Sequence, residues 1–320
     1  MPYSKCGVLL VNIGSPESPS KGNVKKYLRD FLLDPWVINL TFWQRWVLVH
    51  GVILPFYASS SSKLYRSLWT EQGFPLKVYT EKLKIALQTA IGPKFDVRYA
   101  LRYQNPSLQT VLASFKDCQQ LLIVPLFPQY ASSTTGSLIN AVEDILKNKP
   151  DFPQVKFIQP FFNNPFFIKS FVSHAHRYLK NDHYDHYLFS YHGLPKSHLK
   201  KLSPHYQEQC FETTNLLVKE FGLKEGEFTT CFQSRLGFIP WTRPYTDEII
   251  KQLAKRGVKK ILVVAPSFVT DCLETIQEIG IKYKNIFLRH GGETLNLVGG
   301  LNDDPCWVDG LKQIIIEGGF

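Results

Sequence analysis

Short apolar runs alternate with helix-length amphipathic stretches along the chain, and this alternation most restricts its possible folds. The runs predicted as strands lie at residues 7–13, 95–101, 120–127, 155–161, 186–192, 228–234, 259–268 and 285–290. Stretches with helical periodicity lie between or after them, among them 137–148, 244–256 and 304–316. Such alternation is typical of βαβ units, in which helices cover both faces of a parallel sheet and the strands are continuously apolar. The sequence therefore predicts an α/β protein with parallel sheets.

The two halves of the sequence resemble each other. VNIGSP near the start and SYHGLP in the middle both end an apolar run with Gly-x-Pro, while LLIVP and LVVAP both end a later run with proline. We expect two similar Rossmann-like domains, residues 1–160 and 161–300, with a cleft between them. Residues 301–320 should form a C-terminal helix that can pack back on the first domain. The first half is longer, and we expect the extra segment, at about 36–75, to form a lip over the cleft.

The charge balance favours an anionic partner. The chain has 37 Lys and Arg against 27 Asp and Glu, which gives a net charge of +10. Such a charge suits nucleic acid, an acidic membrane surface or a small polyanion. We expect no nucleic-acid partner, because the sequence has no block of five Lys or Arg and no nucleic-acid-binding motif.

The cysteines and the first residues bear on cofactors and compartment. The 6 Cys lie far apart and form no C-x-x-C pair. This spacing argues against a zinc site or a locally ligated iron-sulfur cluster and predicts reduced cytosolic thiols. Only a few polar residues precede the first apolar run, which is too little for a signal peptide. We therefore expect a cytoplasmic protein.

The segment 36–57, WVINLTFWQRWVLVHGVILPFY, is apolar enough to suggest a membrane span. Gln44, Arg45 and His50 lie in its middle and Pro55 near its end, so we exclude a span. Two interpretations stay open. Tryptophans around an arginine fit a segment that lies on an acidic membrane surface, and the same residues fit a buried helix pair with one solvated edge.

The ends of two predicted strands carry residues suited to proton or metal chemistry. His192 directly ends the run 186–192, where parallel α/β sheets bind their ligands, and a neutral imidazole there can accept a proton or bind a metal ion. After the run 259–268, Asp271, Glu274 and Glu278 follow at i, i+3 and i+7, on one face of a predicted helix. Structural roles also fit them: a histidine bonded at a turn, a capping box of Asp271 and Glu274, and a solvated Glu278.

Eight blocks, in order over nearly the whole chain, resemble the ferrochelatase family. They are LLVNIGSP, LRDFLLDP, ALRYQNPS, PLFPQYASSTTGS, SYHGLP, CFQSRLGFIPWTRPYTDE, VAPSFVTDCLETIQEI and the LND-P-W pattern in LNDDPCW. The resemblance implies a two-domain chelatase fold and insertion of Fe²⁺ into protoporphyrin IX, the last step of haem synthesis. It also implies that Fe²⁺ is a substrate and that no cofactor is bound permanently.

The resemblance also implies roles for individual residues. The residues expected in catalysis are His192, Glu274 and Asp271, of which His192 and Glu274 are also expected to hold the metal. The residues expected to bind the porphyrin are Ile13, Arg102, Tyr103, Tyr130 and Trp241. This assignment agrees with the chemistry, because two pyrrole N–H protons must leave before iron binds, and a histidine is a base that is neutral at pH 7.

Three positions depart from the pattern of some family members. Lys282 stands where the family often continues its acidic row, which shortens or reroutes a carboxylate path for iron. Ile13 stands where relatives that use coproporphyrin carry a tyrosine, which favours protoporphyrin IX. Cys306 stands alone near the carboxyl terminus, so we expect no iron-sulfur cluster.

Several functions remain as alternatives. A chelatase for cobalt or nickel, or one acting on coproporphyrin III, needs the same base and carboxylate. A non-catalytic tetrapyrrole or metal carrier needs no base, so the combination of His192 and Glu274 argues against it. The Trp-rich segment adds a possible peripheral association with the acidic inner face of the cell membrane.

Overall fold

A computed structural model describes residues 5–179, 183–201, 205–237 and 239–319. The chain divides into two compact units, one made of Met1–Gln159 and Leu311–Phe320 and the other of Pro160–Gly310. Each unit is described by itself. The two share one plan, a four-stranded parallel sheet with helices packed against it, so the predicted α/β class with two similar Rossmann-like domains is confirmed.

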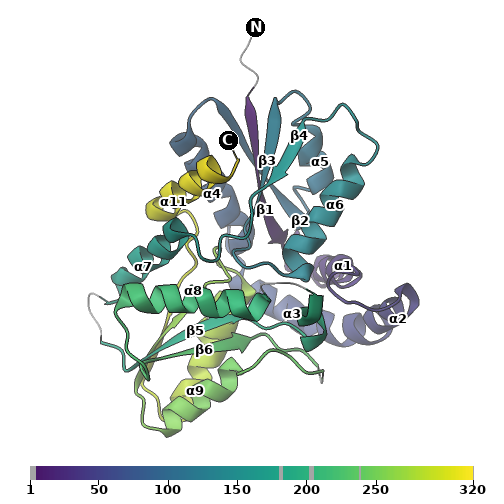
Figure 1. The fold of residues 1–320 in the computed structure, drawn as a ribbon. Helices are drawn as coiled ribbons and strands as arrows, with labels where there is room; N and C mark the ends of the chain where they lie inside the picture. Colours follow the sequence, from purple (N-terminus) through teal and green to yellow (C-terminus); the bar gives the residue numbers. More distant parts are fainter. Residues whose placement is uncertain (1–4, 180–182, 202–204, 238, 320) are drawn as a thin grey trace. The chain divides into compact units, whose positions relative to one another are not determined.

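The sheet of the first unit has the strand order β2-β1-β3-β4. Its strands are β1 (Cys6–Gly14), β2 (Phe95–Tyr103), β3 (Gln120–Pro125) and β4 (Gln154–Phe157). Four consecutive residues of β1, Val8 to Val11, are fully buried, because helices cover both faces of this sheet. Helix α4 (Pro75–Ile91) lies on one side of the sheet, and α5 (Leu108–Ala113) and α6 (Ser137–Leu146) lie on the other (Figure 1).

The sheet of the second unit repeats this order as β6-β5-β7-β8. Its strands are β5 (His186–His192), β6 (Phe228–Gln233), β7 (Lys260–Val264) and β8 (Thr294–Val298). Its helices are α7 (Pro165–Leu179), α8 (Tyr206–Phe221), α9 (Thr246–Lys255), the π-helix η4 (Leu273–Tyr283) and α10 (Lys284–Arg289), with a 3₁₀ turn η3 (Lys196–Lys201). In both units the order reverses between the first and third strands, and open α/β sheets bind ligands at the carboxyl ends of strands at such a point.

One predicted strand is wrong. The run NIFLRH forms α10 instead, which continues directly from η4, and Phe287 fills the core from it. The fourth strand of the sheet is β8, which begins after a turn through Gly291, whose φ is +99°. A short apolar run does not distinguish a strand from a buried helix by its periodicity. In the structure Tyr283 and Phe287, four residues apart, are both buried, as expected for one face of a helix.

The last helix, α11 (Pro305–Gly319), contributes its final turns to the first unit. Gly319 lies so close to Leu122 of β3 that a Cβ on it would stand 2.4 Å from that side chain. Its carbonyl accepts a hydrogen bond from Lys156 of β4 at 3.3 Å. The end of α11 therefore packs directly on the first sheet.

The Trp-rich segment forms α2 (Phe42–Val47), the π-helix η1 (Leu48–Ile53) and α3 (Leu54–Leu68), which follow α1 (Lys21–Leu32). Val49 and Leu54 pack with Leu32 of α1 in a small core. Arg45 is buried and donates hydrogen bonds to the carbonyls of Ile38 and Leu40, at 3.2 and 2.7 Å. The segment therefore has an internal side that is fixed by packing and by two hydrogen bonds from the Arg45 guanidinium.

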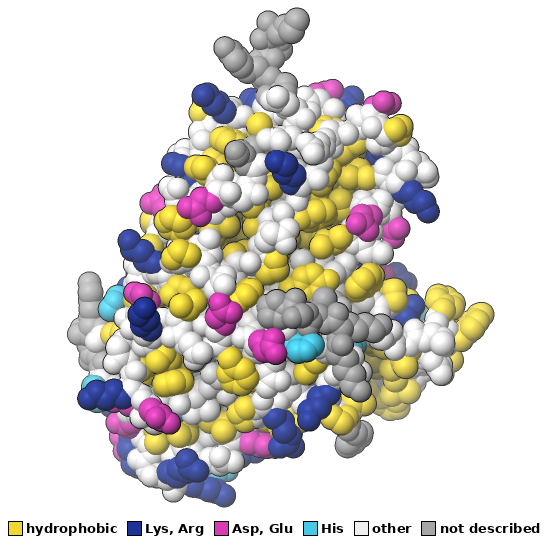
Figure 2. All heavy atoms as spheres, viewed as in Figure 1, with side chains coloured by type: hydrophobic (Ala, Val, Ile, Leu, Met, Phe, Trp, Pro, Cys, Tyr) yellow, Lys and Arg dark blue, Asp and Glu magenta, His cyan; other side chains and the backbone are white. Residues whose placement is uncertain are grey.

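The other side of this segment is apolar and exposed. Trp43 is 72% exposed and Phe56 is 74% exposed. Figure 2 shows hydrophobic side chains gathered over the α2 region. Among the helices in the described part of the chain, none combines the length and apolar character needed to cross a membrane.

Candidate active site

His192 ends β5 and lies opposite Gln233, which ends β6. The next residue, Gly193, donates its N–H to the carbonyl of Gln233 at 2.8 Å, and a Cβ at Gly193 would stand only 2.8 Å from that oxygen. Any larger residue would push the two strand ends apart. The glycine of SYHGLP is therefore required by the close approach of the strands that present His192.

The hydrogen bond of the His192 ring determines which nitrogen can react. Nδ1 lies 2.6 Å from the carbonyl oxygen of Gly193. A carbonyl can only accept a hydrogen bond, so Nδ1 carries the hydrogen and Nε2 of the neutral ring keeps its lone pair. The ring is half-buried and lies near Phe268, with 6.2 Å between ring centroids. Nε2 is thus the nitrogen of His192 that can accept a proton or bind a metal ion.

Trp241 lies beside the same loop. Its indole Nε1 donates to the carbonyl of Leu236 at 2.9 Å, and its ring comes within 3.5 Å of the Cβ position of Gly193. A backbone bridge joins Trp241 to Pro195, two residues after Gly193. The structure therefore brings Trp241 and His192 to one end of the second sheet.

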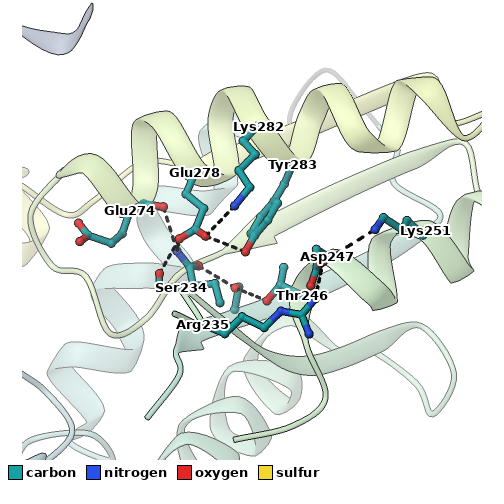
Figure 3. A network of polar contacts seen from close by, with 11 residues as sticks. Ser234, Arg235, Thr246, Asp247, Lys251, Glu274, Glu278, Lys282 and Tyr283 are labelled. Atoms are coloured by element: carbon teal, nitrogen blue, oxygen red, sulfur yellow. Dashed lines mark hydrogen bonds and ion pairs between the residues drawn. The ribbon is translucent and has the colours of Figure 1, made fainter. Parts of the chain in front are cut away.

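Glu274 lies in the first turn of η4. Its carboxylate points away from the polar network around Glu278 (Figure 3). Burial first, and then the charge of Glu274, raise the pKa of the neighbouring Cys272 thiol well above its usual value, so this cysteine stays protonated. π-Helical segments are uncommon and are often found at functional sites, which makes η4 a second structural sign of function beside the strand ends.

The alternative structural role of Asp271 and Glu274, as a capping box, is not what the structure shows. The helix begins one residue later, with Cys272 as N-cap and Thr275 as its capping-box partner, and the N–H of Cys272 donates to Oγ1 of Thr275 at 3.0 Å. Asp271 instead accepts hydrogen bonds from Thr275 at 2.9 Å, from the N–H of Gly300 at 3.0 Å and from Asn302 at 2.8 Å. Its carboxylate ties the start of η4 to the loop after β8.

These environments predict that removal of the two carboxylates lowers the free energy of unfolding by different amounts. Asp271→Ala leaves three donors without their acceptor, so we expect the free energy of unfolding to fall by about 2 kcal/mol or more. Glu274→Ala should cost less than about 1 kcal/mol while it strongly reduces activity. Urea unfolding of both variants measures the difference. Equal stabilities of the two variants would contradict this division of roles.

Asp34 is the centre of a buried polar cluster in the first unit. One of its carboxylate oxygens, Oδ2, accepts hydrogen bonds from Arg102 at 2.7 Å, from the Tyr103 hydroxyl at 2.8 Å and from Ser137 at 2.7 Å. Its other oxygen, Oδ1, accepts from the backbone N–H of Trp36 at 2.8 Å. Asp34 thereby joins the end of β2, the start of α6 and the start of the Trp-rich segment.

This cluster changes the interpretation of Arg102 and Tyr103. The charge of Arg102 is compensated by Asp34, and its Nε is engaged by Ser137 at 2.8 Å. Burial first, and then the charge of Asp34, raise the pKa of the Tyr103 hydroxyl, so Tyr103 remains a protonated donor. The Arg102 guanidinium therefore has a compensated charge, and its N–H groups are held in fixed directions.

Ile13 lies at the carboxyl end of β1, and Tyr130 lies in the segment that follows β3. Both are half-buried, and burial raises the pKa of the Tyr130 hydroxyl. Gly14, directly after Ile13, has a φ of +112°, and a Cβ on it would stand 2.1 Å from the carbonyl oxygen of Tyr103, so only glycine fits there. Tyr130 and Trp36 both approach Gly136, at 3.0 and 3.1 Å from its Cβ position. The first sheet thus gathers Ile13, Tyr103 and Tyr130 at its carboxyl end.

Solved structures define the class of protein with this fold. The sirohydrochlorin chelatase SirB from Bacillus subtilis subspecies spizizenii, in complex with cobalt, is 12% identical and covers 98% of this chain and 95% of its own, with a TM-score of 0.58. SirB from Bacillus subtilis with Fe³⁺ is 14% identical over 98% of this chain and 95% of its own, with a TM-score of 0.57. The chain has the fold of the chelatases.

Sequence comparison then identifies the family. The family model described as Ferrochelatase matches residues 5–318. A ferrochelatase of Coxiella burnetii (strain Dugway 5J108-111) is 42% identical over 97% of this chain and 93% of its own length. A ferrochelatase of Legionella pneumophila (strain Lens) is 42% identical over 97% of this chain and 98% of its own length. The chain belongs to the ferrochelatase family, a family of metal-inserting enzymes.

Proposed function

We propose that this chain inserts Fe²⁺ into protoporphyrin IX to form haem b, the last step of haem biosynthesis. The observation that carries the proposal is the His192 ring, whose Nδ1 is engaged by a backbone carbonyl at 2.6 Å while Nε2 keeps a lone pair. The family of the chain supports the same activity. Fe²⁺ is a substrate in this reaction, and we propose that the enzyme holds no permanent cofactor.

The reaction requires two protons to leave the porphyrin. Fe²⁺ and the neutral macrocycle give haem and two H⁺, so each leaving proton needs an acceptor that has a free lone pair when the substrates bind. His192 Nε2 accepts a pyrrole proton in this scheme. The Glu274 carboxylate, which points away from the Glu278 network, serves as a second acceptor or as an oxygen ligand for the incoming ion.

A planar porphyrin gives an incoming ion no approach to its nitrogens. Bending the macrocycle exposes them, and contacts remote from the reacting centre must supply the energy for this distortion. Arg102, Tyr103, Tyr130 and Trp241 are the residues we propose for such contacts, since each is held in place by packing or hydrogen bonds. Ile13 cannot ligate iron, which favours protoporphyrin IX as the substrate.

Purified protein supplied with protoporphyrin IX and Fe²⁺ in the absence of oxygen tests the proposal. We expect the haem absorption spectrum to appear at a rate proportional to the protein concentration. The same mixture with heat-denatured protein measures the uncatalysed rate. Equal rates in the two mixtures would rule the proposed function out.

We further propose that the Trp-rich segment binds an acidic membrane surface. The exposed apolar side chains of α2 and α3 supply the surface to be buried, and the net charge of +10 supplies attraction to anionic lipid. Aromatic side chains bury a large area each and are favoured at the headgroup level of membranes. The inner side of the segment packs on α1, which leaves its other, apolar side exposed.

Sedimentation with vesicles of anionic lipid tests this second proposal. We expect wild-type protein to pellet at low salt, and the double variant Trp43→Ser with Phe56→Ser to bind about tenfold or more weakly, because both side chains are largely exposed. Ile85→Ser, at a 54% exposed position on α4, is the matched control and should bind like wild type. Wild-type protein that stays in the supernatant, or a double variant that binds as well as wild type, would refute a lipid-binding segment.

A further inference from the structure

The Gln233 side chain connects the strand end of His192 to the helix of Glu274. Gln233 ends β6 and is only 1% exposed. Its Oε1 accepts a hydrogen bond from Ser190 of β5 at 2.7 Å. Its Nε2 donates to the backbone carbonyl of Glu274 at 2.9 Å and to the Glu278 carboxylate at 3.2 Å. One buried amide thus contacts both elements that carry the proposed catalytic residues.

The backbone of Gln233 strengthens this connection. Its carbonyl accepts the N–H of Gly193, the residue whose own carbonyl engages the His192 ring. A shift of Gln233 would therefore move both the loop that orients His192 and the first turn of η4. Only a side-chain amide can make this set of contacts, since it accepts one hydrogen bond from a hydroxyl and donates two to oxygens.

Glu278 forms a second contact between η4 and the end of β6, beside the one at the Glu274 carbonyl. Its carboxylate accepts hydrogen bonds from Ser234 and from the Tyr283 hydroxyl, the latter at 2.9 Å, and forms an ion pair with Lys282 at 3.5 Å (Figure 3). Burial first, and then the charge of Glu278, raise the pKa of Tyr283, so its hydroxyl remains a donor. The end of β6 therefore holds η4 at both the Glu274 carbonyl and the Glu278 carboxylate.

We propose that Gln233 is a positioning residue for metal insertion, which sets the Glu274 carboxylate relative to the His192 ring. The inference rests on the proposed function of the chain. A carbonyl contact fixes the first turn of η4, and a displacement of about 1 Å of a reacting group can cost about 100-fold in rate. Because its side chain is only 1% exposed, Gln233 acts through the backbone geometry of the two elements that it joins.

Two substitutions test the proposal. Gln233→Met keeps the length of the side chain and removes the three hydrogen bonds of its amide, so we expect kcat to fall by about 10- to 100-fold. Gln233→Glu places a second carboxylate beside Glu278, which repels it and raises the pKa of one of the two. A protonated carboxyl can donate one hydrogen bond again, so the kcat of this variant relative to wild type should rise as the pH falls.

Gln209→Met is the matched control, because Gln209 is a glutamine of the same unit that is 3% exposed and lies on α8. It should lower stability without lowering kcat. Ser190→Ala removes only the hydroxyl that holds Oε1 and serves if the Gln233 variants do not fold; we expect a smaller loss of kcat in the same direction. Hydrogen exchange of residues 273–283 adds a readout that does not need activity, and it should quicken in Gln233→Met but not in Gln209→Met.

The outcomes separate this inference from the proposed function. If wild-type protein makes no haem, the proposed function fails, while exchange in residues 273–283 still tests whether Gln233 holds η4. Unchanged exchange and an unchanged kcat in a folded Gln233→Met enzyme would overturn the positioning role. So would an equal loss of kcat in Gln209→Met, since that result indicates a general effect of altering buried amides.

Discussion

His192→Ala is expected to reduce haem formation by about 10²- to 10⁴-fold, the contribution usual for a positioned proton acceptor. The physical reason is the loss of Nε2, the ring nitrogen that keeps its lone pair because Nδ1 is engaged by the Gly193 carbonyl. The ring is half-buried and ends its strand, so the fold should survive its removal. Initial rates of haem formation without oxygen measure the effect.

His290→Ala provides the control for this prediction. His290 is also half-buried, and its Nδ1 also lies near a backbone carbonyl, that of Ile286, at 2.8 Å. The control should therefore show whatever loss follows from deleting such a ring, without the loss of a proton acceptor. Insertion of iron by His192→Ala at the wild-type rate would disprove the mechanism.

Asp34→Ala is expected to destabilise the first unit by about 3–5 kcal/mol, because removal of one partner leaves Arg102 as an uncompensated charge and frees two hydroxyl donors. Asp34→Asn keeps an acceptor oxygen and should cost about 1–3 kcal/mol. In protein that remains folded, both variants should raise the KM for the porphyrin, since Arg102 and Tyr103 lose their common anchor. Urea unfolding and porphyrin titration of the initial rate measure the two effects.

Asp30→Ala is the matched control in the same unit. Asp30 pairs with Arg29 at 3.0 Å and accepts a hydrogen bond from Gln104 at 2.7 Å, but the Asp30 and Arg29 side chains are 33% and 46% exposed. Losing one surface ion pair and one hydrogen bond should cost about 1–2 kcal/mol. A loss of stability in Asp34→Ala no larger than that in Asp30→Ala would contradict the account of the buried cluster.

The two sheets could be predicted because most of their strands lie within runs that are mainly apolar. β1 and β5 coincide closely with the predicted runs 7–13 and 186–192. β8 could not be predicted in this way, since Thr294 and Asn296 interrupt its apolar residues, while the unbroken apolar triplet before it, residues 286–288, lies in α10. Local composition identified the class of fold, but tertiary packing decided which of two neighbouring segments became the strand.

The candidate site was only partly predictable for a related reason. His192 could be found because a histidine that ends an apolar run is visible in the sequence. Asp34 lies 68 residues from Arg102 and 103 from Ser137, so nothing near it in the sequence indicates its partners. Gln233 likewise lies 41 residues from Glu274. The residues that hold others in position depend on contacts that only the folded chain creates.

Asp271 and Glu274 illustrate the limit of a pattern. Three residues apart, they look like equivalent acids on one helix face. In the structure Asp271 lies before η4 and accepts three hydrogen bonds, while the carboxylate of Glu274 points away from the polar network of its helix. The spacing predicted that both acids lie near the site, but their hydrogen bonds distinguish an anchoring residue from a candidate reacting group.

The most direct test of the proposed function is the identity of the product that the wild-type enzyme forms from a mixture. The mixture contains protoporphyrin IX and coproporphyrin III in equal amounts with Fe²⁺, Co²⁺ and Ni²⁺, kept free of oxygen, and mass spectrometry identifies the metallated porphyrins. We predict that iron protoporphyrin IX forms fastest, and that His192→Ala forms almost none. Faster formation of an iron coproporphyrin, or of a cobalt or nickel complex, would contradict the assignment of the substrates.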